Sequence, residues 1–242
     1  MAARVDGGGQ QLALGLARSG VAAQPRARPA SASPTTAVDI EIEGDGTLVV
    51  HEAITYDFGG TQRHGIIRDL VRRERYDDEH DRRYDIEILG VSASEGTPAQ
   101  YEESTDATYL HVRIGDPDRT ITGAHRYDIR YELDGALQTF TEHVELYWDA
   151  IGTQWSVPID RASVAVRAPA GITRVACFAG VEGASLPCAG AGTDGGTARF
   201  SHAALGPGAG LTVVVGIPKG AIQPPPEPIL VERWELSRTR SP

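Results

Sequence analysis

The sequence predicts an all-β fold made of one or two antiparallel β-sandwich domains of the immunoglobulin-like kind. Three observations support this prediction. Apolar and polar residues alternate with a period of two along much of the stretch from Val38 to Ile217, as in strands that bury one face. Glycine and proline turn signals separate the alternating runs. No long segment of this stretch has a helical period, which favours a sandwich or barrel of short strands.

The first predicted element is a β-hairpin. Val38, Ile40 and Ile42 alternate with acidic residues, and the turn signal Gly-Asp-Gly follows at 44–46. The alternation then resumes in the run 48–58. Two alternating runs joined by a glycine-rich turn are typical of two antiparallel strands.

Further short strands are predicted along the chain in order. The next run, at 84–91, contains Gly90, where we expect a β-bulge. The run 127–134 has one apolar and one charged face, as expected when one side of a sheet packs on the core. The other strands are predicted around Leu110, Leu146, Val164, Val175, Phe200 and Val213.

These elements divide the chain into four predicted segments. Residues 1–36 are expected to be disordered or a defective leader. Residues 37–150 form a β-sandwich domain, and residues 151–222 form a second β-sandwich or a continuation of the first. Residues 223–242 are a Pro-rich linker and tail. A length of 242 residues suits one large domain or two small ones.

Both end segments carry incomplete signals for export and attachment. PASAS at 29–33 has the small-x-small pattern of a cleavage site, but LALGLA at 12–17 is shorter than the apolar core of a signal peptide, about 7–15 residues. The triple proline at 224–226 favours an extended, stiff spacer. The sequence contains no apolar run of about 20 residues, the length that a membrane-spanning helix needs.

Charge and cysteine content limit the environment and the partners. A net charge of -10 argues against nucleic acid as a partner and against a polybasic contact with anionic lipid. Cys177 and Cys188 flank a glycine-containing loop, which predicts a local disulfide and an oxidising compartment. The alternative is a pair of buried free thiols. A metal site is not expected at these cysteines, because no other ligands lie nearby at the required spacing.

Four stretches together resemble a known family. They are YDFGGTQRHGIIRDL at 56–70, HVELYWDAIGTQWSVPI at 143–159, the CFAG…C pair at 177–188 and LGPGAGLTVVVGIPKG at 205–220. In this order they resemble a bacterial family of predicted membrane proteins, domain of unknown function 2207, over residues 37–232.

The resemblance implies a location rather than an activity. Family members have a signal peptide, an extracytoplasmic β-rich region, a Pro-rich junction and transmembrane helices, and no activity is established for them. We therefore expect an extracytoplasmic domain at the cell membrane or envelope. The chain departs from the family pattern at both ends, where the leader is defective and the transmembrane region is missing.

The loop from Phe58 to Asp69 holds the candidate binding residues Arg63, His64, Arg68 and Asp69 beside a Gly-Gly pair that permits unusual backbone angles. The structural alternative is a tight crossover in which Arg68 and Asp69 form an ion pair while Ile66 and Ile67 pack inside. Tyr147, Trp148 and Trp155 offer either a carbohydrate platform or, because Trp148 shares the inward phase with Leu146, part of the core.

We expect no cofactor and no metal, because the sequence has no phosphate-binding loop, dinucleotide fingerprint, nucleophile elbow or H-E-x-x-H motif. His51, His111 and His143 fall on the solvent phase of their strands, as ordinary surface histidines do. The mixed-charge segment 72–85 is expected to be a salt-bridged loop, with calcium binding as the alternative.

The sequence therefore favours an extracytoplasmic β-sandwich module of a membrane-anchored envelope protein, with a binding, sensing or structural role. Its partner would be an envelope protein or a glycan. The first alternative is an envelope hydrolase acting on glycan or peptide, which requires a nucleophile and base, or paired carboxylates, in one cleft. The second alternative is a truncated gene product.

Overall fold

The computed structural model describes residues 35–233, which form strands and no helix. The strands are β1 (Thr35–Ile42), β2 (Leu48–Asp57), β3 (Gly65–Val71), β4 (Arg73–Arg75), β5 (His80–Arg83), β6 (Asp85–Ala93), β7 (Tyr101–Thr105), β8 (Tyr109–Gly115), β9 (Ala124–Asp134), β10 (Leu137–Thr139), β11 (His143–Ile151), β12 (Ile159–Arg167), β13 (Arg174–Val181), β14 (Gly190–Asp194), β15 (Thr197–Leu205), β16 (Ala209–Pro218) and β17 (Ile229–Glu232). The all-β prediction is confirmed.

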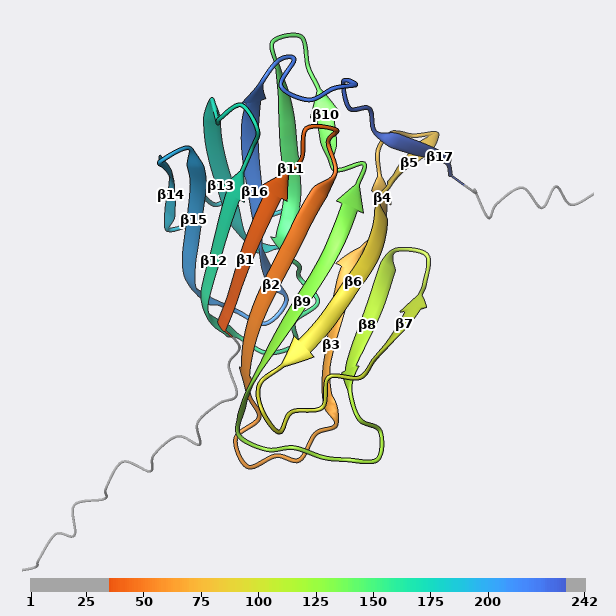
Figure 1. Ribbon diagram of the computed structural model, residues 1–242, viewed down its shortest axis with the longest axis vertical. Coiled ribbons are helices and arrows are strands. Elements are labelled where there is room, and N and C mark those ends of the chain that lie inside the picture. Colours follow the sequence, from red (N-terminus) through yellow and green to blue (C-terminus); the bar gives the residue numbers. More distant parts are fainter. Residues whose placement is uncertain (1–34, 234–242) are drawn as a thin grey trace, which may run out of the picture.

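The strands form a β-sandwich-like arrangement of two main sheets and two small ones (Figure 1). A seven-stranded sheet has the order β14-β15-β12-β1-β2-β9-β6, and a four-stranded sheet has the order β10-β11-β16-β13. The small sheets have the orders β3-β8-β7 and β17-β5-β4. The two main sheets touch where β13 meets β14 and β15, where β16 meets β12 and β15, and where β11 meets β1.

One pairing departs from the predicted antiparallel pattern. β1 pairs with β12 in parallel, from Thr35 opposite Arg161 to Glu41 opposite Arg167, whereas the other paired strands are antiparallel. A parallel pair needs a long connection, and here the chain between β1 and β12 supplies it. Strands from both sides of residue 150 therefore share the seven-stranded sheet. The register of β6 on β9 shifts between Ile88 and Gly90, as the predicted bulge requires.

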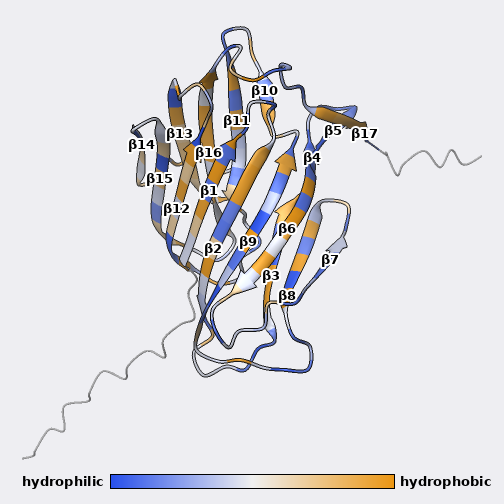
Figure 2. Cartoon of the chain, viewed as in Figure 1, coloured by the Kyte–Doolittle hydropathy of each residue, from blue (hydrophilic) through white to orange (hydrophobic). Residues whose placement is uncertain are grey.

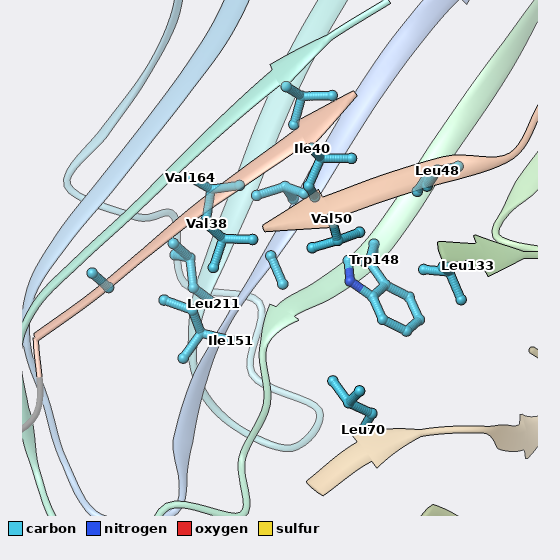
Figure 3. Packing of buried hydrophobic residues seen from close by; sticks show 14 of the residues in the cluster. Val38, Ile40, Leu48, Val50, Leu70, Leu133, Trp148, Ile151, Val164 and Leu211 are labelled. Atoms are coloured by element: carbon cyan, nitrogen blue, oxygen red, sulfur yellow. The ribbon is translucent and has the colours of Figure 1, made fainter. Parts of the chain in front are cut away.

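A single hydrophobic cluster fills the space between the sheets. The period-two alternation produces it, as in β8, where hydrophobic and hydrophilic bands alternate along the strand (Figure 2). Figure 3 shows Val38, Ile40 and Val50 of the large sheet packed near Ile151 and Leu211 of the smaller one.

The aromatic residues considered as a carbohydrate platform lie mainly inside the molecule. Trp148 and Trp155 are 3% and 8% exposed, and Trp148 packs edge-on against the ring of Tyr84. Only Tyr147 is exposed, at 50%. Trp148 and Trp155 therefore belong to the core.

The mixed-charge segment 72–85, for which a loop was predicted, contains the β4–β5 hairpin. Asp81 of this hairpin accepts from Arg73 at 2.8 Å and from Arg233 at 3.0 Å. The arginines stabilise the hairpin and fix the C-terminal strand beside it, because β17 pairs with β5.

The predicted Pro-rich spacer lies against the domain in its described part, up to residue 233. Ile222 is 1% exposed, the Gln223 amide donates to the Gly44 carbonyl at 2.9 Å, and the Thr139 hydroxyl donates to the Pro226 carbonyl at 2.8 Å. Of the predicted leader, Thr35 and Thr36 belong to β1. Residues 1–34 and 234–242 lie outside the described residues.

The expected disulfide joins Cys177 in β13 to Cys188, with a Cα–Cα distance of 5.5 Å. It closes the loop that leads from β13 in the four-stranded sheet to β14 in the seven-stranded sheet. The sequence separation is 11 residues, so the bond is local to one end of the sandwich.

Candidate functional site

The sheet β3-β8-β7 has one apolar face in the core and one polar face toward solvent. Ile66, Leu70 and Val112 point inward, while the residues between them point outward. Two rows of residues lie side by side on the outer face: Ile67 is opposite Arg113, and Asp69 is opposite His111. The pleat therefore brings together side chains from separate parts of the sequence.

A groove of about 530 Å³ runs over this outer face, and we call it the outer-sheet groove. The loop that follows β11 forms one wall, and it is tied to β8 by a hydrogen bond from the Gln154 amide to the Tyr109 hydroxyl at 2.8 Å. The lining residues are Tyr56, Phe58, Arg63, Gly65, Ile66, Ile67, Asp69, Ser104, His111, Arg113, Gln154, Trp155, Ser156 and Val157.

A pair of glycines lets β3 and β8 approach closely at the edge of the outer-sheet groove, which Gly65 lines. Gly65 and Gly115 are opposite each other in β3 and β8, with φ of 149° and 146°. A Cβ atom on Gly65 would lie 1.9 Å from the Ile114 carbonyl oxygen, and one on Gly115 would lie 1.9 Å from the His64 carbonyl oxygen. Only glycine fits at these two positions, because a side chain at either one would clash with the backbone of the opposite strand.

His111 lies between two carboxylates beside the groove. Its Nδ1 is 2.7 Å from Asp69 Oδ1, and its Nε2 is 3.3 Å from Asp106 Oδ2. The hydrogen bond to Asp69, with a smaller contribution from Asp106, raises the pKa of His111 above its usual range. Asp106 is itself held by the backbone N–H groups of Tyr109 and Thr108, which lower its pKa.

This arrangement stabilises a protonated imidazole rather than a general base. Ser104 is opposite His111, and His111 is opposite Asp69, so a hydroxyl, an imidazole and a carboxylate lie in one row across three strands. A base would have to take the serine proton on a free imidazole nitrogen. Both ring nitrogens of His111 face carboxylates instead, so neither is free to accept the serine proton.

A second polar cluster lies inside the molecule beneath this sheet. Glu52 is fully buried and Arg68 is 3% exposed. Arg68 Nε donates to Glu52 Oε2 at 2.7 Å and Nη2 donates to Oε1 at 2.9 Å. The Tyr131 hydroxyl donates to Glu52 Oε1 at 2.8 Å, and Arg68 Nη1 donates to the Asp69 carbonyl at 2.6 Å. Every charge is paired, as burial requires.

Burial and pairing act in opposite directions on Arg68. Burial lowers the pKa of the guanidinium, but the adjacent Glu52 carboxylate raises the pKa by more, so Arg68 stays charged. Burial is the main cause, and the nearby Glu52 charge the second, that raises the pKa of Tyr131 well above its usual value. The Tyr131 hydroxyl therefore keeps the proton that it donates to Glu52. The cluster links β2, β3 and β9 through side chains.

The structure distributes the four candidate residues of the loop over different environments. Arg63 and Asp69 line the outer-sheet groove. His64 lies with Nδ1 3.1 Å from the Asp116 carbonyl and 3.2 Å from the Arg119 carbonyl. Arg68 is internal, and its carboxylate partner is Glu52 rather than the Asp69 of the crossover hypothesis.

The crossover hypothesis also predicted that Ile66 and Ile67 pack inside, and this is correct for Ile66 alone. Ile66 is buried, whereas Ile67 is 49% exposed on the groove floor.

Sequence reasoning missed Glu52 as the buried partner and His111 and Arg113 as groove residues. Glu52 falls in the inward phase of its strand, between Val50 and Ile54. A charged residue in the apolar phase signals a buried ion pair, and this signal was available. His111 and Arg113 carried no such signal, because their outward phase is typical of any surface residue.

Metal-binding geometry is absent from residues 35–233, where no three His, Cys, Asp or Glu side chains gather as ligands. His51 lies 3.1 Å from Asp128, and His143 lies 3.4 Å from Glu145, which Arg174 also contacts. These two histidines each contact a carboxylate, at separate places in the fold. Within the same residues no helix is long and apolar enough to cross a membrane.

The fold and the groove define an all-β domain with an open, arginine-bearing site on one small sheet. The chain belongs to the family described as Predicted membrane protein (DUF2207) N-terminal domain, which matches residues 34–217. This confirms the resemblance drawn from the sequence motifs. Among curated proteins, none matches the chain.

Solved structures with similar strand arrangements are remote. The M1 zinc metallopeptidase from Deinococcus radiodurans is 13% identical with a TM-score of 0.38, over 76% of this chain and 41% of that protein. Leukotriene A4 hydrolase from Saccharomyces cerevisiae is 9% identical with a TM-score of 0.47, over 77% and 29%. The chain spans less than half the length of either protein. At these values neither likeness assigns an activity.

Proposed function

We propose that this domain is the extracytoplasmic part of a membrane-anchored envelope protein and acts there as a binding module. The observation that carries the binding role is the outer-sheet groove. Its two arginines, Arg63 and Arg113, are exposed, and neither forms an ion pair or a side-chain hydrogen bond with any residue of the described part of the chain. Exposed arginines beside an apolar floor are typical of recognition surfaces.

Two features support the extracytoplasmic location. The family consists of predicted membrane proteins and this chain matches their N-terminal domain. The disulfide between Cys177 and Cys188 fits an oxidising compartment, since thiols in the cytosol are kept reduced. The His111 geometry gives the hydrolase alternative no support at this site, because both ring nitrogens of the imidazole face carboxylates.

The location is tested in cells that express the gene. A Glu95→Cys variant places a thiol in the exposed turn between β6 and β7, where a membrane-impermeant maleimide would label it in intact cells. In the same cells, alkylation without a reductant should leave Cys177 and Cys188 unmodified. Labelling at 95 only after lysis, or alkylation of both native cysteines, would refute the extracytoplasmic assignment.

A further inference from the structure

The chain after β16 is held on the domain in two different ways. Its first part, residues 219–226, is held by burial, because Ile222 is 1% exposed within the core cluster. Its last part, residues 229–233, contains β17 and lies beside the β4–β5 hairpin (Figure 1). We call the first part the proximal anchor and the last part the C-terminal latch. Glu227 and Pro228 connect them.

The C-terminal latch has little apolar surface to hold it. No residue of β17 is buried: Ile229 and Val231 are half-buried, whereas Leu230 and Glu232 are exposed. In β16, by contrast, most residues are buried. Segments with few buried apolar contacts open locally at a lower free energy than the core strands of the same protein. The C-terminal latch is therefore expected to open more readily than the sandwich.

Polar contacts hold the C-terminal latch instead, and they meet at Asp81 of β5. Its Oδ2 accepts from Arg73 Nε at 2.8 Å, and its Oδ1 lies 3.0 Å from Arg233 Nε. Arg73 Nη2 also donates to the Glu232 carbonyl at 2.8 Å, and the Arg233 amide donates to the Glu79 carbonyl at 2.9 Å. One carboxylate therefore orients both arginines that hold the end of β17.

Solvent reaches these ion pairs. The side chains of Asp81, Arg73 and Arg233 are 19%, 30% and 35% exposed, and all three residues line a cavity of about 690 Å³. Ion pairs that water reaches are weakened by salt, unlike the buried pair of Arg68 and Glu52. The contacts of the C-terminal latch can therefore break and form again without exposing the core.

Detachment of β17 changes how the chain leaves the domain. With β17 on β5, the chain is fixed as far as Arg233. With β17 detached, it is fixed only as far as Pro226, whose carbonyl accepts from the Thr139 hydroxyl. Residues 227–233 then form a tether that reaches roughly 25 Å when extended. The closed latch holds the following residues in one orientation, and the open latch frees them.

We propose that β17 is a releasable latch. It detaches from β5 as a unit while the sandwich and the proximal anchor stay folded, and the Asp81 carboxylate keeps it closed. A short segment with two such states is a common form of conformational switch. This inference concerns the exit of the chain and goes beyond the proposed binding role, on which it does not depend.

The test is amide hydrogen exchange of the full 242-residue chain, followed by NMR. The Arg233 and Val231 amides report on the C-terminal latch, and the Val213 and Val215 amides of β16 report on the sandwich. The two latch amides should share one protection factor, at least about 30-fold smaller than those of β16, because the latch opens without unfolding of the domain. Equal protection in β17 and β16, or no protection in β17, would overturn the proposal.

Variants show whether Asp81 keeps the latch closed. Asp81→Asn preserves the shape of the side chain but removes its charge, so protection of Arg233 should fall by about fivefold while that of Val213 stays constant. Arg73→Gln removes one of the two arginines and should lower protection by about twofold. Asp194→Asn removes an exposed carboxylate of another hairpin and should change neither. An unchanged Arg233 in Asp81→Asn, or an equal loss at Val213, contradicts the role of Asp81.

A salt arm tests the electrostatic cause. Sodium chloride at about 1 M should lower the protection of Arg233 in the wild-type chain, because it screens exposed ion pairs, and should have a smaller effect in Asp81→Asn. The same response in both proteins would show that the ion pairs do not hold the latch. Thermal midpoints check that each variant is folded.

Discussion

Replacing Arg68 by methionine removes one half of the buried ion pair and leaves Glu52 charged in the interior. In the wild-type protein the carboxylate accepts two hydrogen bonds from Arg68, at 2.7 and 2.9 Å, and one from the Tyr131 hydroxyl at 2.8 Å. In Arg68→Met only the bond from Tyr131 remains. Breaking a buried pair in this way costs about 3–5 kcal/mol, because the remaining charge stays desolvated.

This loss is large for a domain of this size. Folded domains are stable by roughly 5–15 kcal/mol, so Arg68→Met removes at least about a fifth of the total. The thermal midpoint should fall by roughly 6–20 °C, since each kcal/mol corresponds to about 2–4 °C for 150–250 residues. Urea unfolding followed by circular dichroism measures the free energy directly, and Arg130→Met, at an exposed position, should change it by no more than about 0.5 kcal/mol.

Two further measurements identify the cause. The buried carboxyl of Arg68→Met gains by binding a proton in the folded state, so the loss of stability should be smaller at pH 5 than at pH 8. Adding Glu52→Gln removes the uncompensated charge and keeps an oxygen for the Tyr131 hydroxyl, so the double variant should be more stable than Arg68→Met alone. A loss below about 1 kcal/mol in Arg68→Met, or no recovery in the double variant, would refute the reasoning.

Three other predictions concern separate parts of the fold. Cys177→Ser opens the local disulfide and should lower the free energy of unfolding by about 3 kcal/mol according to the chain-entropy relation. Under reducing conditions the wild-type protein also lacks this bond, so the variant and the wild type should then be equally stable. His111→Gln should lower stability most near pH 5.5. The raised pKa of His111 gives a stabilisation that is complete below the unfolded value of about 6.5 and is lost as the pH rises through the folded value, so a constant difference up to pH 9 would contradict it. Ile222→Ala should cost about 2–5 kcal/mol, because this side chain is 1% exposed, and a neutral result would show that the segment after β16 does not pack on the domain.

The alternation of apolar residues was sufficient to predict the long strands of the two main sheets and their buried faces, but β3, β4, β5, β7, β10, β14 and β17 were not predicted, and β3 begins inside the segment predicted as a loop. Val38, Ile40, Tyr127 and Leu146 were placed inward by pattern alone, and all four are buried. The period of two is a property of the backbone, so it can be read without knowledge of the partner strand. The same holds for the bulge at Gly90, which depends on a local break in the pattern.

The sequence did not predict which strands pair with each other. The parallel pairing of β1 with β12 joins residues more than 120 positions apart, and no local signal specifies it. The outer-sheet groove depends on the same kind of information. Asp69 and His111 meet only because β3 and β8 pair in one particular register, and a shift by one residue would put them on opposite faces.

The sequence by itself determined the fold class, the family and the pair of cysteines, because each of these depends on local pattern or on motif order. The tertiary structure alone decided which charged residues are internal and which are available to a ligand. Glu52 and Arg68 satisfy each other in the core, whereas Arg63 and Arg113 lie on the groove without such a partner among the described residues. The physical reason is that the position of a charge relative to its nearest opposite charge is set by strand register, which only the packed sheets define.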